Sequence, residues 1–220
     1  MKVIAFNGSP RKQWNTASLL NKALEGAASQ GAEVELIHLY DLNFKGCTSC
    51  FACKTRGSKS YGKCAMTDDL TPILRKIEEA DSIILGSPIY FGSVTGETRS
   101  FMERLMFSYL TYTNPPQSLF PKKINVGFIY TMNVPEELAS KAGYDKYIDQ
   151  QGMPLKMLLG GKLENLCSFD TCQFSDYSKV VADRFDAQEK AKRHEEVFPE
   201  DCKKAFELGI RLVRENHKHE

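Results

Sequence analysis

The chain has 220 residues, of which 42% are hydrophobic and 26% are charged, so its composition is that of a globular protein able to bury a core. Its 29 lysines and arginines nearly balance its 28 aspartates and glutamates, and the formal net charge is +1. This balance gives no electrostatic reason to expect nucleic acid or a membrane surface as a partner.

Strand and helix signals alternate along the chain. Strands are predicted where short apolar runs end in turn residues, and helices where apolar residues recur at helical spacing. In chain order the predicted elements are a strand at Lys2–Phe6, a helix at Thr16–Gly31, a strand at Glu33–Leu39, a helix at Asp68–Ala80, a strand at Ser82–Gly92 that runs into a turn, a helix at Thr95–Leu110, a strand at Ile124–Thr131, a helix at Tyr147–Gly160, a strand within Lys162–Phe174 and a last helix at Pro199–Asn216.

This alternation predicts an α/β fold with helices on both faces of a parallel sheet. Right-handed crossovers then give a doubly wound, three-layer sandwich whose five parallel strands follow the order 2-1-3-4-5. No linker, repeat or low-complexity segment divides the chain. We therefore expect one domain over residues 1–220.

The N-terminus and the number of cysteines indicate where in the cell the protein is expected. The first apolar run, Val3–Phe6, is too short for the core of a signal peptide, and no run of about 18 apolar residues follows. We therefore expect a cytoplasmic protein. Seven cysteines, an odd number, then argue against a disulfide framework and for metal, redox or packing roles.

The loop after the first strand, Asn7–Ser18, has the chemistry of a phosphate site. It matches neither the G-x-x-x-x-G-K-[ST] nor the G-x-G-x-x-G pattern of nucleotide-binding loops. It offers hydroxyl, amide and guanidinium groups just before a helix N-terminus, and these suit a phosphate monoester. The candidate residues are Ser9, Arg11, Asn15, Thr16 and Ser18. The alternative is a polar turn in which Asn15 or Thr16 caps the helix.

The loop after the third strand offers a wall for a flat ring. Pro88, Ile89, Tyr90 and Phe91 follow a buried strand at the edge of the sheet where ligands bind in such folds. Core packing explains either aromatic residue taken alone. Because a phosphate loop and an apolar wall are expected side by side, the pair indicates a mononucleotide cofactor, with a flavin as the natural candidate.

At this point the residues resemble a known family. The segments GSPRKQWNTASLL and SPIYFGSVTGETRSFMERL, with GCTSCFAC and GKCAMTDDL between them, resemble the NADPH-dependent FMN reductase and iron–sulfur flavoprotein family of flavodoxin-like proteins over about residues 1–110. The resemblance implies a flavodoxin-like fold and FMN as cofactor. It implies phosphate contacts from Ser9, Arg11, Asn15, Thr16 and Ser18, ring contacts from Pro88, Ile89, Tyr90, Phe91 and Gly92, and a third contact near Thr131, Met132 and Asn133. Trp14 departs from the family, which often has a small residue there.

The cysteines Cys47, Cys50, Cys53 and Cys64 form a C-x2-C-x2-C-x10-C pattern on the loop after the second strand. Thiolates at such spacing favour an iron–sulfur cluster or zinc. The resemblance implies a [4Fe–4S] cluster, although the last gap is longer than in iron–sulfur flavoproteins. Reduced thiols that line a pocket, zinc and a redox disulfide remain alternatives. We expect these cysteines on the same rim of the sheet as the flavin.

The resemblance implies an oxidoreductase in which FMN takes a hydride from NAD(P)H and passes electrons to a flavin, a quinone, an aromatic compound or a protein. The alternative is an iron–sulfur flavoprotein that carries electrons with a ferredoxin-like partner. No catalytic residue is assigned, because the cofactor performs the hydride chemistry. A homodimer or homotetramer is expected, with the segments 101–112 and 113–121 as candidate contacts.

Overall fold

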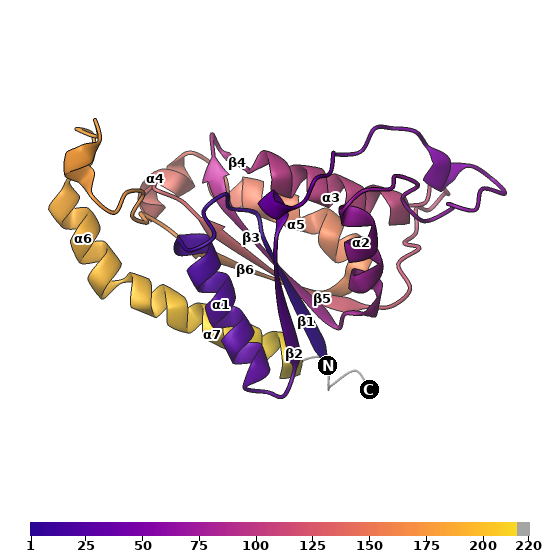
Figure 1. Ribbon diagram of the computed structural model, residues 1–220, viewed down its shortest axis with the longest axis horizontal. Coiled ribbons are helices and arrows are strands. Elements are labelled where there is room, and N and C mark those ends of the chain that lie inside the picture. Colours follow the sequence, from indigo (N-terminus) through magenta and orange to yellow (C-terminus); the bar gives the residue numbers. More distant parts are fainter. Residues whose placement is uncertain (215–220) are drawn as a thin grey trace.

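The structure, a computed structural model, describes residues 1–214, and at its centre lies a parallel β-sheet (Figure 1). The five parallel strands are β1 (Lys2–Asn7), β2 (Glu33–His38), β3 (Ser82–Tyr90), β5 (Ile124–Thr131) and β6 (Gly160–Ser168). Their spatial order is β2-β1-β3-β5-β6. The predicted fold class and the order 2-1-3-4-5 of the parallel strands are therefore confirmed.

A sixth strand, β4 (Ser93–Val94), is an addition to the prediction. It pairs antiparallel with the end of β3, where Ile89 faces Val94 and Tyr90 faces Ser93. Phe91 and Gly92 form the tight turn between them, with φ angles of 51° and 79°. A strand of two residues is too short to show an alternating pattern in the sequence.

Two hydrophobic cores lie on opposite faces of the sheet. On one face, α1 (Asn15–Ala28) and α7 (Phe198–Arg214) cover Val3 and Ala5 of β1. On the other face, α2 (Leu70–Glu79), α3 (Gly96–Tyr109) and α5 (Tyr144–Leu159) cover the alternate residues Ile4 and Phe6. Successive side chains of a strand point to opposite faces, which produces the three layers seen in Figure 1.

Helices α1 and α7 pack at unusually close range through two glycines. A Cβ atom at Gly26 would lie 1.9 Å from the carbonyl oxygen of Phe206, and one at Gly209 would lie 1.8 Å from that of Ala23. Only glycine allows the two backbones to approach this closely. The last helix of the described chain is thereby held against the helix that follows the first loop.

The remaining helices differ from the prediction in detail. Helix α4 (Glu136–Lys141) was not predicted, and α5 begins at Tyr144 rather than Tyr147. Helix α6 (Ala187–Glu196) lies in the charged stretch that precedes the last helix. The predicted end of that last helix at Asn216 lies outside the described residues.

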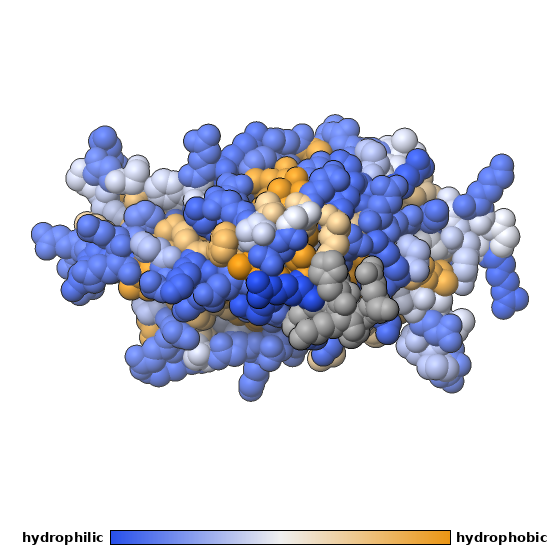
Figure 2. Space-filling model, turned by 90° about the horizontal axis from the view of Figure 1, so that it is seen from below, coloured by the Kyte–Doolittle hydropathy of each residue, from blue (hydrophilic) through white to orange (hydrophobic). Residues whose placement is uncertain are grey.

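The face of the molecule drawn in Figure 2 is mostly hydrophilic. Seen from below, hydrophobic side chains gather in a limited central area with hydrophilic ones around it (Figure 2). In the part of the chain that the structure describes, no helix has both the length and the apolar character needed to cross a membrane.

Candidate functional site

A cleft of about 390 Å³ lies at the carboxyl ends of the parallel strands, which is where ligands bind in open α/β sheets. Its volume falls within the usual range for small-molecule sites. Its lining combines four segments that are far apart in the sequence: Ser9, Arg11, Trp14, Asn15 and Thr16; Pro88, Ile89 and Tyr90; Thr131, Met132 and Asn133; and Thr171, Cys172, Gln173 and Phe174.

One end of the cleft has the character of an anion site. Helix α1 begins there with Trp14 in the N-cap position, no side chain caps its first turn, and that turn contains no acidic residue. Backbone N–H groups at such an end have no partner within the helix and attract a negative group. The alternative prediction, in which Asn15 or Thr16 caps the helix, was wrong.

Arg11 adds a positive charge at this end. Its guanidinium carbon lies 3.8 Å from the centre of the Trp14 ring, and its Nη1 donates a hydrogen bond of 2.5 Å to the carbonyl oxygen of Gln173. Burial lowers the pKa of Arg11, but an arginine keeps its charge at neutral pH. The side chain is therefore a fixed cation at the mouth of the cleft.

The loop after β6 closes the cleft against α1. The carbonyl oxygen of Cys172 accepts hydrogen bonds from Trp14 Nε1 at 3.0 Å and from Asn15 Nδ2 at 2.7 Å. Thr16 Oγ1 and Thr131 Oγ1 lie 2.8 Å apart and join the first loop to the end of β5. These bonds hold the first loop, the end of β5 and the loop after β6 together on one side of the cleft.

The opposite side is formed by the end of β3. Pro88 and Ile89 are half-buried, and Tyr90 is exposed over 44% of its surface. The turn that follows points Phe91 into solvent, and it is fully exposed. The result is a short wall of one aliphatic and two cyclic side chains, which suits the face of a planar ring.

The structure brings together eight of the predicted cofactor-binding residues, and three lie elsewhere. Ser9, Arg11, Asn15, Thr16, Pro88, Ile89, Tyr90 and Thr131 line the cleft. Ser18, Phe91 and Gly92 are not among its lining residues. Ser18 lies one turn into α1, where its N–H bonds to the carbonyl of Trp14, and the left-handed backbone at Phe91 directs that side chain away.

Sequence reasoning did not find the segment Thr171–Phe174. It contains no motif, but it follows the last predicted strand, and the carboxyl ends of parallel strands meet at one edge of the sheet. Its position after the last strand was the one feature of the sequence that could have assigned it to the cleft. Two of its residues, Cys172 and Gln173, accept hydrogen bonds from residues of the first loop.

A second, smaller cavity is lined by all four cysteines of the C-x2-C-x2-C-x10-C pattern, namely Cys47, Cys50, Cys53 and Cys64. Helix α3 supplies Glu103, Arg104 and Phe107 to the same cavity. All seven cysteines are free thiols, so the structure contains no disulfide among residues 1–214. Within those residues, no set of three or more histidine, cysteine or acidic side chains converges closely enough to hold a metal ion as it stands.

The donor chemistry of this cavity nevertheless fits an iron–sulfur cluster, because four thiols face one small space. Three of them lie on one short segment with left-handed backbone at Ser49 and Phe51, and Cys50 is exposed.

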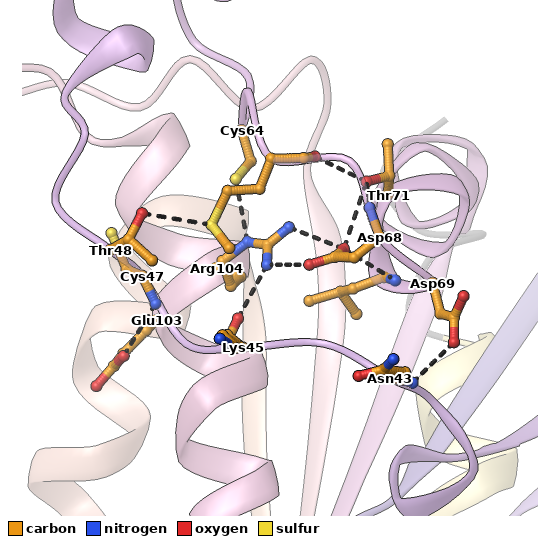
Figure 3. Close-up of polar contacts among 12 residues, drawn as sticks. Asn43, Lys45, Cys47, Thr48, Cys64, Asp68, Asp69, Thr71, Glu103 and Arg104 are labelled. Carbon is orange, nitrogen blue, oxygen red and sulfur yellow. Dashed lines mark hydrogen bonds and ion pairs between the residues drawn. The ribbon is translucent and has the colours of Figure 1, made fainter.

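Arg104 is the centre of the polar contacts beside this cavity (Figure 3). Its side chain is 0% exposed, and it is ion-paired with Asp68 at 2.7 Å and 3.1 Å. Its Nε donates to Cys64 Sγ at 3.0 Å, and Nη1 donates to the carbonyl of Lys45 at 2.9 Å. Burial alone would raise the pKa of Asp68, but the hydrogen bonds and charge of Arg104 outweigh it and that pKa is lowered.

The cysteine loop is also tied to the end of α3. The ammonium of Lys54 donates to the carbonyl oxygens of Phe107 at 2.5 Å, Ser108 at 3.1 Å and Leu110. The N–H of Cys47 donates to Glu103 Oε2 at 3.3 Å. A lysine at the last carbonyls of a helix satisfies groups that have no partner within the helix.

The two cavities are separate. The cysteine loop leaves the edge of the sheet after β2 and extends along α3 (Figure 1). None of the four cysteines lines the cleft, although they were expected on the same rim. The reason is that the loop follows the helix to its C-terminal turns.

Comparison with known proteins gives one family match. The family model described as NADPH-dependent FMN reductase matches residues 1–131. An iron–sulfur flavoprotein of Methanocaldococcus jannaschii is 45% identical over 104 residues, which are 47% of this chain and 51% of that protein. One from Archaeoglobus fulgidus is 42% identical over 104 residues, 47% of this chain and 48% of that protein. The matches thus span about half the length of these curated relatives.

Solved structures show the same fold at low identity. An NAD(P)H:quinone oxidoreductase from Methanothermobacter marburgensis has a TM-score of 0.69 and 15% identity, covering 96% of this chain and 98% of that one. An azoreductase from Bacillus anthracis str. Sterne has a TM-score of 0.67 and 13% identity, covering 96% and 99%. At these identities the likeness establishes the fold, which is flavodoxin-like.

Proposed function

The chain belongs to the NADPH-dependent FMN reductase family, and we propose that it is an FMN-dependent oxidoreductase that takes a hydride from NAD(P)H and passes electrons to a second acceptor. The observation that supports this most directly is the cleft, where an uncapped helix N-terminus and Arg11 lie at one end and Pro88, Ile89 and Tyr90 form a wall. We propose that residues 1–220 act as one FMN-binding domain.

The residues at the polar end would hold the phosphate. Arg11 supplies a charge, the first turn of α1 supplies N–H groups, and Ser9 and Thr16 supply hydroxyls. Asn15 lies beside them as an amide donor. The chain offers no acidic residue in the first turn of α1 to repel an anion.

The residues at the other end would orient the ring. Pro88 and Ile89 exclude water from one side, and Tyr90 adds a partly exposed aromatic face. Thr131 and Asn133 lie on the side of β5 and offer polar contacts. When bound, FMN supplies the hydride and electron chemistry, so these residues need only bind, orient and shield it.

The acceptor belongs to one of the classes that reduced flavins serve: a quinone, a free flavin, an aromatic compound or a protein. Two structural neighbours, a quinone oxidoreductase and an azoreductase, support the small-molecule classes. A homodimer or homotetramer is part of the proposal, as is NAD(P)H as the electron donor.

A second candidate function is that of an iron–sulfur flavoprotein that carries electrons with a ferredoxin-like partner. The observation that favours it is the cavity lined by Cys47, Cys50, Cys53 and Cys64. The names of the relatives that match this part of the chain support it. We propose that these thiols hold a [4Fe–4S] cluster; bound zinc, a redox disulfide and unligated thiols are the competing outcomes.

Two measurements on one anaerobic sample test the proposal. The protein is reconstituted with FMN, assayed for iron and acid-labile sulfide, and mixed rapidly with NADPH or NADH while the visible flavin absorbance is followed. Fast bleaching supports the reductase. Slow bleaching with matched iron and sulfide, and reduction by a ferredoxin-like donor, favours the carrier. Failure to bind FMN would overturn both.

A further inference from the structure

Arg104 is a fully buried cation whose hydrogen bonds are almost all accounted for. Nη1 donates to Asp68 Oδ2 and to the carbonyl of Lys45, and Nη2 donates to Asp68 Oδ1. A buried guanidinium without such partners would be strongly destabilising. Asp68 balances its charge, so the pair is neutral as a whole.

The remaining Nε–H donates to the sulfur of Cys64 at 3.0 Å. The sulfur of a thiol is a weak acceptor, whereas a thiolate accepts a strong, charge-assisted hydrogen bond. The buried Nε–H of Arg104 therefore forms its strongest hydrogen bond with Cys64 when the Cys64 sulfur is a thiolate. Sulfurs that ligate iron are thiolates.

Cys64 is also the cysteine whose position the pattern leaves least defined. Cys47, Cys50 and Cys53 follow one another at two-residue gaps, but ten residues separate Cys53 from Cys64. Arg104 fixes Cys64 from a helix 40 residues further along the chain. Close spacing restrains the positions of the first three cysteines, and the contact with Arg104 restrains the position of the fourth.

We propose that Arg104 is a positioning residue that places Cys64 as the fourth ligand and, through its Nε–H···Sγ hydrogen bond, stabilises the reduced form of the cluster. This inference rests on the proposed cluster. One-electron reduction adds one negative charge to the cluster and its sulfurs without breaking a bond. Hydrogen bonds to the sulfurs favour the more negative state and so raise the reduction potential.

The test compares Arg104→Lys with the matched control Arg75→Lys, which makes the same change at an exposed position of α2. Both variants and the wild type are purified anaerobically. Bound FMN, iron and sulfide per chain are measured, and the cluster is titrated with dithionite under EPR detection. We expect Arg104→Lys to retain FMN, to lose iron or to hold a cluster with a lower midpoint potential, and Arg75→Lys to match the wild type.

The outcomes distinguish the role of Arg104 from the existence of the cluster. Wild-type iron content and midpoint potential in Arg104→Lys would overturn the role of Arg104 and leave the cluster standing. Wild-type protein that binds FMN but no iron would overturn the cluster and this inference with it.

A measurement on the wild type covers the case in which Arg104→Lys fails to fold. In protein containing isotope-labelled arginine, the EPR signal of the reduced cluster is expected to show hyperfine coupling to a guanidinium nitrogen. A purely structural Arg104–Asp68 pair would give no such coupling, and its absence would overturn the proposal.

Discussion

The guanidinium of Arg11 stacks on the ring of Trp14 at 3.8 Å while its Nη1 holds the carbonyl of Gln173. One side chain thus joins the loop after β1 to the loop after β6 at the polar side of the cleft. Trp14 is the only tryptophan of the chain, so its fluorescence reports on this end of the cleft alone.

The first prediction concerns Arg11→Ala. Loss of a charge-assisted hydrogen bond of about 1.5–3 kcal/mol should weaken FMN binding by roughly ten- to a hundred-fold. The measurement is a titration of the apoprotein with FMN, followed by quenching of Trp14. Lys12→Ala is the control, because Lys12 is exposed and pairs with Asp41 outside the cleft lining.

Riboflavin, which lacks the phosphate, sharpens this test. The wild type should prefer FMN to riboflavin, and Arg11→Ala should bind the two with nearly equal strength. An undiminished preference for FMN in the variant would contradict the assignment of Arg11 to the phosphate.

The second prediction concerns the stability of the core. The hydroxyl of Tyr130 is buried and has no hydrogen-bond partner within the described residues. An unsatisfied buried polar group costs about 1–3 kcal/mol, so Tyr130→Phe should raise the free energy of unfolding by about 1 kcal/mol in urea. The control Tyr109→Phe should lower it, because the Tyr109 hydroxyl donates to Glu78 Oε1 at 2.8 Å. Equal losses in both variants would refute the prediction.

The third prediction concerns alkaline pH. Burial, with smaller contributions from Asp145 and Glu136, raises the pKa of Cys167 to about 12. In the unfolded chain this thiol loses its proton near pH 8.5, so above that pH the folded state binds more protons and stability falls as pH rises toward 12. We expect a loss of about 1–2 kcal/mol between pH 8 and pH 10.

Urea unfolding at the two pH values checks this. The loss should be smaller in Cys167→Ala than in the wild type. The same pH dependence in both proteins would show that another group is responsible.

The fourth prediction concerns the anchor of the cysteine loop. In Lys54→Met the carbonyls at the end of α3 lose their shared donor, and the ammonium that lies over the rings of Phe107 and Tyr112 is removed. We expect stability to fall by about 1–2 kcal/mol and amide exchange in residues 47–64 to become faster. Lys59→Met, at an exposed position of the same loop, should leave exchange unchanged. Slow exchange in Lys54→Met would show that other contacts hold the loop.

The sheet was predictable because most of its strands carry short apolar runs that end in turn residues, and these appear in the sequence itself. The order of the five parallel strands followed from the alternation of elements and the handedness of crossovers. The cleft was predictable where a motif marked it, at Ser9, Arg11, Asn15, Thr16 and Pro88–Tyr90. The loop Thr171–Phe174 carries no motif, so only its place after the last strand could have indicated it.

Other features depend on backbone geometry or tertiary contacts that no local pattern records. Phe91 belongs to an apolar run, but its left-handed backbone turns it into solvent. Arg104 sits in an amphipathic helix, where an arginine indicates the exposed side, yet its side chain is completely buried because Asp68 and Cys64 lie within reach. The four cysteines were expected on the same rim of the sheet as the flavin, but they line a separate cavity because the loop runs along α3.

Helix α3 sets the separation between the two cavities. It begins at Gly96 after the N-cap residue Thr95, whose hydroxyl donates to the carbonyl of Gly8 in the first loop at 2.7 Å, and Arg104 lies about 12 Å beyond Gly96 at 1.5 Å per residue. The helix fixes both the distance and the rotation between these two residues. Adding or deleting one residue between Thr95 and Arg104 would turn the guanidinium by about 100° around the helix, away from Cys64. Changes in loop length elsewhere leave this spacing untouched, so the distance from the first loop to Cys64 depends on α3 and not on the length of the cysteine loop.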